Sequence, residues 1–105
     1  MIARTWTGYV KPEKAQAYIE LMETVALPDY KGTPGNLGAW CLHRDLGGKT
    51  EIVMLTFWES MDAIKRFAGD GETTAKYYDF DKDYLIEMPE NSVHFGVRGI
   101  APILA

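Results

Sequence analysis

Residues 50–58 (TEIVMLTFW) are mainly apolar at both sets of alternating positions. Successive side chains of a strand point to opposite faces of a sheet, so this pattern predicts a strand that is covered on both faces. Residues 2–10 are also rich in β-branched and aromatic residues and are predicted to be a strand, as are residues 37–44 and 92–98. With only 105 residues, the chain has room for a single domain, which we place over residues 1–105.

Two helices are predicted between these strands. Residues 12–26 carry one apolar stripe, made by Tyr18, Leu21, Met22 and Val25, and we expect Pro28 to end this helix. Residues 61–68 follow a serine that suits a helix N-cap and precede a glycine that suits a C-cap. A third, short helix is predicted over residues 73–79, with residues 80–90 irregular or helical.

The resulting order is β-α-β-β-α-β, which is the ferredoxin-like, or split βαβ, motif of an α+β fold with an antiparallel sheet. Helices cover only one face of such a sheet, although the predicted strands are apolar on both. Exposed apolar faces of this size mark interfaces, and a two-fold axis would bring two such sheets together. We therefore expect a homodimer in which the two sheets pack face to face.

Composition and charge exclude several classes of partner. The formal net charge is −4 and the lysines and arginines are scattered, so we expect no nucleic-acid partner. No apolar stretch approaches the ~20 residues of a membrane span, and no signal peptide is evident, so we expect no membrane partner. A single cysteine, Cys41, is typical of a chain in the reducing cytoplasm, where we expect this one.

Several segments resemble the antibiotic biosynthesis monooxygenase (ABM) family of dimeric α+β barrels. They include residues 33–39 (TPGNLGA), residues 57–60 (FWES) and residues 67–69 (FAG), together with Ala75, the Tyr77–Tyr78 pair and Val93–His94. The resemblance extends over nearly the whole chain. The Trp-x-Ser step into a helix is its most diagnostic part, although it marks the fold rather than an activity.

The resemblance implies one of several activities. Members of the family include cofactor-independent monooxygenases of aromatic polyketides and haem-degrading enzymes. The haem-degrading branch uses an Asn on the first strand, a Trp in the helix after the third strand and a His ten residues later. This chain has Thr5, Phe67 and Tyr77 at the matching places, which is evidence against haem degradation, although a tyrosine can ligate haem iron.

Histidines and tyrosines are the candidate acid–base groups. His94 and His43 lie on predicted strands, and an unperturbed histidine titrates near about pH 6.5, so either could serve as a general base, His94 in preference. Tyr77 and Tyr78 are adjacent and would point about 100° apart on a helix, so at least one is expected to reach a pocket. The alternative for each histidine is a hydrogen-bonded or exposed residue of the sheet, and for each tyrosine it is core packing with the hydroxyl at the surface.

Hydroxyl and indole groups on the strands are candidates for the lining of a pocket. Thr5, Thr7 and Tyr9 share one strand face, where buried hydroxyls need partners or line a cavity. The tryptophans could stack on a flat ligand, although packing in the core or a dimer interface is the preferred interpretation. They are Trp6, Trp40 and Trp58.

Metal and cofactor sites are not expected. Cys41 and His43 are two residues apart, but a metal site needs three or four ligands. Residues 79–90 imitate a calcium loop, but Tyr84 stands where that loop needs glycine, so we interpret them as a solvated acidic stretch. No dinucleotide-binding glycine pattern occurs, so no bound nicotinamide or flavin is expected.

The resemblance, taken with these residues, implies a homodimeric, cofactor-independent monooxygenase or a related small-molecule enzyme. It would be an oxidoreductase acting on an aromatic or polycyclic substrate held between sheet and helices. Its catalytic groups would be Thr5, Tyr77, Tyr78 and His94, with Thr7, Trp58 and Phe67 in contact with the substrate. One alternative is a non-catalytic protein that binds a small hydrophobic ligand in the same pocket. Another is a haem-binding or haem-degrading protein.

Overall fold

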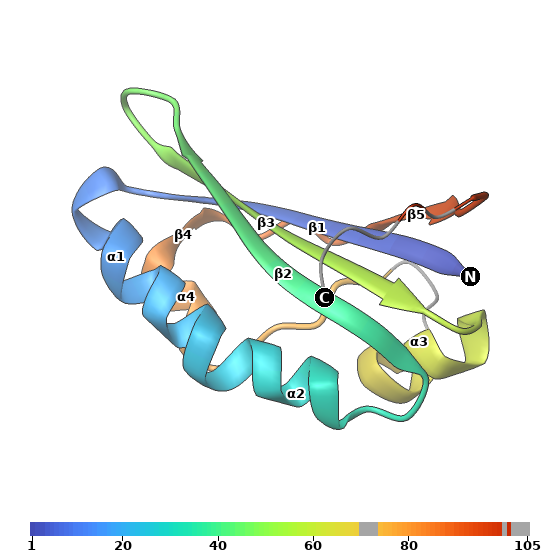
Figure 1. Cartoon of the computed structure of the whole chain (residues 1–105). Helices are drawn as coiled ribbons and strands as arrows, with labels where there is room; N and C mark the ends of the chain where they lie inside the picture. The colour runs from blue at the N-terminus through green and yellow to red at the C-terminus, as the bar shows by residue number, and fades with distance from the viewer. Residues whose placement is uncertain (70–73, 100, 102–105) are drawn as a thin grey trace.

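The computed structural model describes residues 1–69, 74–99 and 101. One antiparallel sheet lies over a layer of helices, which cover only one of its faces (Figure 1). The elements in chain order are β1 (Ile2–Val10), α1 (Pro12–Leu21), the π-helical turn η1 (Met22–Ala26), α2 (Leu27–Gly32), β2 (Asn36–Asp45), β3 (Thr50–Trp58), α3 (Met61–Ala68), α4 (Asp81–Tyr84), β4 (Leu85–Glu87) and β5 (Val93–Gly96).

The sheet has the strand arrangement expected of a ferredoxin-like fold. The order is β2-β3-β1-β4, with β5 also paired to β1, and every pairing is antiparallel. β5 pairs with residues 2–5 of β1, whereas β4 pairs with Tyr9 and Val10. The place of the last strand is therefore shared by two short strands, where one strand over residues 92–98 was predicted.

The first helix does not end at Pro28, contrary to the prediction. α1 continues through η1 into α2, which holds Pro28 in its first turn and ends at Gly32. The Leu27 N–H bonds to the carbonyl of Met22, five residues back. Proline needs no N–H partner in the first turn of a helix, so the π-helical turn lets the helical path continue past it.

The π-helical turn also changes which residues face the sheet. The buried stripe of the first helical segment recurs every four residues and consists of Tyr18, Met22, Ala26 and Tyr30. Val25, which was predicted to be in the stripe, is 38% exposed. A turn that takes in one extra residue rotates the following side chains, so the stripe inferred from regular α-helical spacing is wrong from that point on.

Side chains of β1 alternate between a covered face and an open face. Trp6 and Val10 point to the helices and are buried, as are Ile52, Met54 and Trp58 of β3. The opposite face, here called the open face, is not covered by the described part of the chain. Its apolar side chains are Trp40, Leu42, Val53, Leu55, Phe57, Val93 and Phe95.

Residues 74–80, here called the strap, cross beneath the sheet without forming the helix predicted for residues 73–79. Their only pairing is a bridge between Thr74 and Asn91. Residue 73 of that prediction lies outside the described residues. The strap is followed by Asp81, which is 2% exposed rather than solvated as expected. Its carboxylate accepts bonds from the Tyr18 hydroxyl at 2.8 Å and the Tyr78 N–H at 2.7 Å.

Two neighbouring helix residues test the position of the buried stripe. Met22→Ala should lower the free energy of unfolding by about 2–5 kcal/mol, because it opens a cavity in the core. Val25→Ala should change it by less than about 0.5 kcal/mol, because that side chain lies at the surface. Urea unfolding of both variants measures the difference. A larger loss for Val25→Ala than for Met22→Ala would contradict the rotated stripe.

The bond between Tyr18 and Asp81 should give a pH-dependent stability. Tyr18→Phe removes a hydrogen bond to a buried carboxylate and should cost about 1–3 kcal/mol at pH 7. Burial raises the pKa of Asp81, while bonds from the Tyr78 N–H and the Tyr18 hydroxyl lower it, and the net direction is upward. The Tyr18 bond favours the ionised form, so its contribution is present above the pKa of Asp81 and is lost as pH falls through it.

Urea unfolding of wild type and Tyr18→Phe between pH 7 and pH 4 measures this dependence. We expect the difference between the two proteins to shrink as the pH falls. A difference that stays constant or grows would show that Asp81 is not the group that responds.

Candidate functional site

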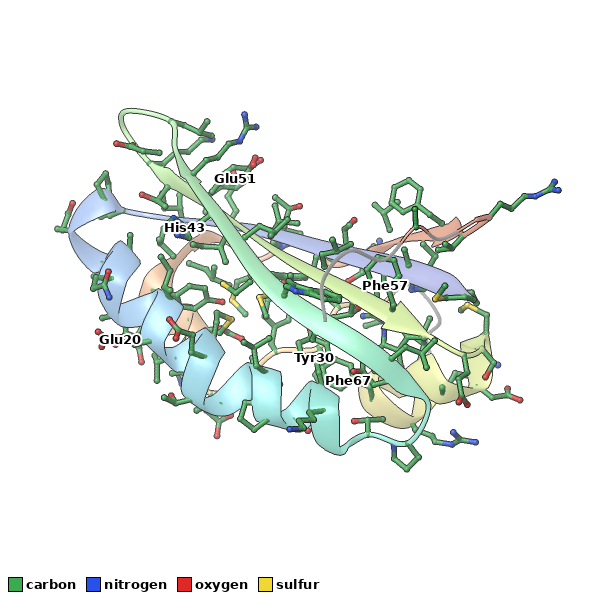
Figure 2. The ribbon with its side chains drawn as sticks, viewed as in Figure 1. Glu20, Tyr30, His43, Glu51, Phe57 and Phe67 are labelled. Atoms are coloured by element: carbon green, nitrogen blue, oxygen red, sulfur yellow. The ribbon has the colours of Figure 1, made fainter. Side chains whose placement is uncertain are left out.

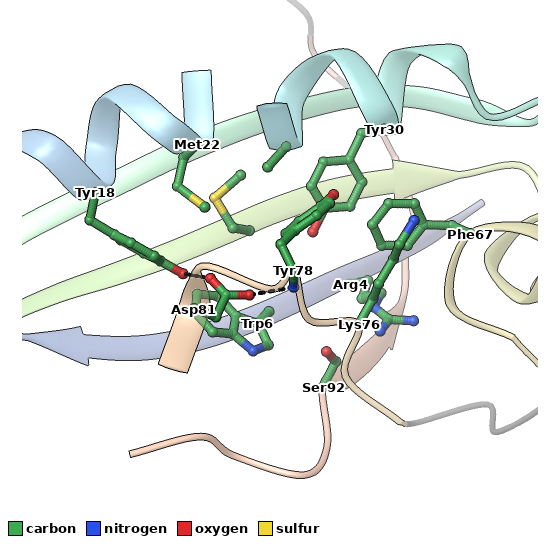
Figure 3. A pocket seen from close by; sticks show the side chains of 12 residues that line it. Arg4, Trp6, Tyr18, Met22, Tyr30, Phe67, Lys76, Tyr78, Asp81 and Ser92 are labelled. Carbon is green, nitrogen blue, oxygen red and sulfur yellow. Dashed lines mark hydrogen bonds between the residues drawn. The ribbon is translucent and has the colours of Figure 1, made fainter. Parts of the chain in front are cut away.

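A small cavity lies between the covered face of the sheet, the first helical segment and the strap (Figure 3). Its volume is about 20 Å³, which is room for about one water molecule. The cavity is therefore nearly filled by the side chains around it. They are Arg4, Trp6, Tyr18, Met22, Ala26, Tyr30, Met54, Phe67, Lys76, Tyr78, Asp81 and Ser92.

Aromatic rings make up one wall of the cavity. Tyr30 of α2 and Phe67 of α3 stack with ring centroids 4.3 Å apart and planes inclined by 19°. Both rings lie beneath the sheet, whereas Glu51 lies on its other side (Figure 2). Trp58 packs behind them, 5.7 Å from Phe67. The wall offers flat apolar surface that suits an aromatic ring.

A guanidinium is also buried in the wall of the cavity. Arg4 is 3% exposed, and its Nη2 donates to the carbonyl of Thr74 at 3.0 Å. Burial lowers the pKa of Arg4 and the nearby Tyr30 hydroxyl raises it, with a net downward shift. An arginine keeps its charge in a protein even so, and this charge lies at the inner wall of the cavity.

Tyr78, Lys76 and Asp29 form a hydrogen-bonded group at the outer wall. The Tyr78 hydroxyl donates to Asp29 Oδ2 at 2.7 Å, and Lys76 Nζ lies 2.6 Å from the same oxygen. Burial raises the pKa of Asp29, but the bonds from Lys76 and Tyr78 outweigh it and the net shift is downward. Burial, and then the bond to Asp29, raise the pKa of Tyr78. Tyr78 therefore stays protonated at neutral pH and acts as a donor.

Tyr78 and Phe67 of the predicted site line the cavity, as does Trp6 of the candidate tryptophans. Trp58 lies directly behind its aromatic wall. Tyr77 points elsewhere, since its ring meets Trp6 edge-on at 6.1 Å and its hydroxyl bonds to the carbonyl of Pro89. His94 pairs in register with Arg4, so it shares the covered face but lies beside the cavity.

The strand threonines lie away from this cavity. Thr5 and Thr7 pair with Leu55 and Val53, which places them on the open face. The expectation that Thr5 and Tyr78 line one pocket is therefore not met. The period-two pattern grouped the two threonines correctly, but it could not tell which face the helices cover. Trp40, also on the open face, is 42% exposed.

Sequence reasoning missed the charged and polar lining of the cavity. Arg4 stands two residues before Trp6 on the face that is otherwise apolar, and this break in the pattern was the signal available. Lys76 lies on the strap and Asp81 follows it directly, and the path of the strap beneath the sheet follows no periodic pattern. Ser92 carried no signal in the sequence.

Neither a metal site nor a reactive thiol is found among the described residues. Their His, Cys, Asp and Glu side chains form no group of three or more that could hold a metal ion. Burial raises the pKa of Cys41 to about 11, so its thiol is not ionised at neutral pH. Within the same residues, no helix has the length and apolar character needed to span a membrane.

Comparison with known proteins identifies structures with the same fold. A Nitrosomonas europaea protein assigned to the antibiotic biosynthesis monooxygenases is 19% identical, with a TM-score of 0.70 over 92% of this chain and 98% of that chain. The ActVA-Orf6 monooxygenase of Streptomyces coelicolor, solved with nanaomycin D, is 22% identical, with a TM-score of 0.59 over 96% and 90%.

A mutant of MhuD with two manganese protoporphyrin IX molecules bound per active site is 18% identical, with a TM-score of 0.62 over 97% of this chain and 99% of that chain. At these identities the likeness establishes the fold alone. No curated protein matches the chain.

The family is established by the sequence itself. The family model described as antibiotic biosynthesis monooxygenase matches residues 1–75. This match covers β1 to α3 and the first part of the strap, and it therefore includes the aromatic wall and Arg4. The chain belongs to the antibiotic biosynthesis monooxygenase family.

Proposed function

We propose that the chain is a cofactor-independent monooxygenase that oxidises a small aromatic molecule between the sheet and the helices. The observation that carries this proposal is the convergence of a stacked aromatic wall with Arg4, Ser92 and Tyr78 on one cavity. Apolar pockets with a few convergent polar groups are typical of ligand sites. Family membership supports oxygenase chemistry, and nanaomycin D in the Streptomyces coelicolor structure supports an aromatic ligand.

An aromatic ligand needs more room than the present cavity offers, so the strap must move to admit it. The strap forms no helix or strand. Bonds hold it at Arg4–Thr74, at Ala75–Glu90 and around Asp29, and Tyr77 packs against Trp6. The side chains of Lys76 and Asp29 are 31% and 35% exposed. Irregular, partly exposed segments open at a lower free-energy cost than core strands and helices. We therefore propose that the strap is the entrance of the site.

The proposed reaction balances without an external reductant. A phenol with a free ring position reacts with O₂ to give a quinone and water. One oxygen atom becomes the new carbonyl, and the other leaves as water with the hydroxyl hydrogen and the ring hydrogen of the substrate. The four electrons that reduce O₂ therefore come from the substrate. The protein has to bind the substrate, exclude water and assist proton transfer.

Tyr78 is our principal candidate for proton transfer, because its hydroxyl lies at the cavity wall and is linked to Asp29. His94 remains a proposed base, since it adjoins Arg4 on the covered face and would come nearer to a ligand if the strap moved. Tyr77 is a weaker candidate, because its hydroxyl is bonded to the backbone at Pro89. Thr5 and Thr7 would contribute only through a partner subunit, since they lie on the open face.

Turnover of 1-naphthol to the naphthoquinone tests the activity. We expect oxygen consumption, one oxygen-18 atom from labelled O₂ in the quinone, and no reaction with 1-methoxynaphthalene, which has no hydroxyl proton to lose. Tyr78→Phe should lower kcat by about a hundredfold, as loss of a proton-transfer group does. Tyr77→Phe is the matched control and should keep most of the activity. Binding of the naphthol without oxygen uptake would instead indicate a non-catalytic ligand-binding protein.

We also propose that the protein is a homodimer formed through the open face. Leu42, Val93 and Phe95 are 46%, 53% and 52% exposed there, and exposed apolar faces of this kind mark interfaces. A second copy related by a two-fold axis would bury the same face on both chains.

Substitution on the open face should separate the two subunits. Leu42→Glu should give a monomer at micromolar concentration in sedimentation velocity, because an isologous interface would bury the new charge twice. Val25→Glu places the same charge on an exposed apolar residue of the helix layer and should leave the dimer intact. A wild-type protein that sediments as a monomer at that concentration would contradict the proposal.

A further inference from the structure

The charge of Arg4 is buried without a counter-ion. Arg4 is 3% exposed, and no carboxylate pairs with it among the residues that the structure describes. Its Nη2 bonds to the Thr74 carbonyl, but its Nη1 is buried with no hydrogen-bond partner. Leaving a buried charge unpaired is unfavourable, so arginines in such places are normally matched to an anion.

A second buried group in the same cavity also lacks a partner. Ser92, just before β5, is 4% exposed, and its Oγ has no hydrogen-bond partner in the described part of the chain. Arg4 and Ser92 both line the cavity (Figure 3). The charge of Lys76 is already balanced by Asp29 at 2.6 Å. The unsatisfied donors of the cavity therefore gather at Arg4 and Ser92.

We propose that Arg4 and Ser92 form a subsite for the carboxylate of an aromatic acid. Arg4 Nη1 would donate to one carboxylate oxygen and Ser92 Oγ to the other, while the ring of the ligand lies against Tyr30 and Phe67. The aromatic part of this assignment rests on the proposed function. It narrows the substrate class from aromatic molecules in general to small acidic ones.

A purely structural role for Arg4 explains less of what is observed. The bond to Thr74 uses Nη2 alone, and Thr74 is exposed, so water could satisfy that carbonyl. A structural arginine would also be expected to have its remaining donors satisfied. The chain as a whole is acidic, with a formal charge of −4, so it offers anions no general attraction. Preference for an acid would therefore have to come from the local charge of Arg4.

Binding of 1-naphthoate, compared with its neutral counterpart 1-naphthamide, tests the subsite without requiring turnover. Isothermal titration calorimetry on the wild-type protein should give at least about tenfold tighter binding of the acid, as expected for a charge-assisted bond. Arg4→Met should abolish this preference and Ser92→Ala should reduce it. Arg44→Met removes an equal charge from an exposed arginine paired to Glu51 and should leave the preference unchanged.

Thermal unfolding without ligand gives a second readout. Arg4→Met should keep or raise the Tm, because it removes an unpaired buried charge. Equal affinity of the wild type for acid and amide would overturn the subsite. An Arg4→Met variant that does not fold would also overturn it, since the charge of Arg4 would then be structural. Naphthoate binding that depends on Arg4, without oxidation of 1-naphthol, would keep the subsite and reject the oxygenase. Oxidation of 1-naphthol without Arg4-dependent binding of naphthoate would reject the subsite and keep the oxygenase.

Discussion

The packing of one helical stripe against one face of the sheet determines most of this structure. Tyr18, Met22, Ala26 and Tyr30 meet the covered face at Trp6, Met54 and Trp58. Because strand side chains alternate, burying one set leaves the other set on the open face. The same packing therefore creates both the aromatic wall of the cavity and the apolar surface that we assign to a dimer interface.

Two buried polar groups distinguish this core from a purely apolar one. Asp81 is satisfied by Tyr18 and Tyr78, so it fixes the end of the strap beneath the sheet. Arg4 is only partly satisfied, by the strap carbonyl of Thr74. An apolar residue in place of Arg4 would make the fold more stable. Buried charges without partners often mark functional sites. The strap links the two groups, since it runs from Thr74, which is bonded to Arg4, to Tyr78, which is bonded to Asp81.

Local patterns were sufficient to predict most of the fold. The strand over residues 50–58 and the helix over residues 61–68 have the predicted bounds, because alternation, a serine cap and a terminal glycine act within a few residues. The order of elements then indicated the ferredoxin-like sheet. The prediction that the helix ends at Pro28 was wrong because the helical path continues through a π-helical turn, which no short-range rule anticipates. The strap was missed because its path is set by contacts with β1 and the first helical segment.

The site was predictable only in part, for a related reason. Tyr78 and Phe67 were selected by resemblance and do line the cavity, whereas Thr5 lies on the other face because alternation does not reveal which face is covered. Arg4 contacts the strap, which lies about 70 residues later in the chain, through its bond to Thr74. Such a pairing becomes visible only once the fold has been assembled.

The central claim is that the cavity beneath the strap receives an aromatic ligand. A crystal structure of the protein soaked with 1-naphthoate tests it most directly. The account predicts density for the ring against Tyr30 and Phe67, a carboxylate within hydrogen-bond distance of Arg4 and Ser92, and a displaced strap. Density on the open face alone, or an unchanged cavity at saturating ligand, would contradict it.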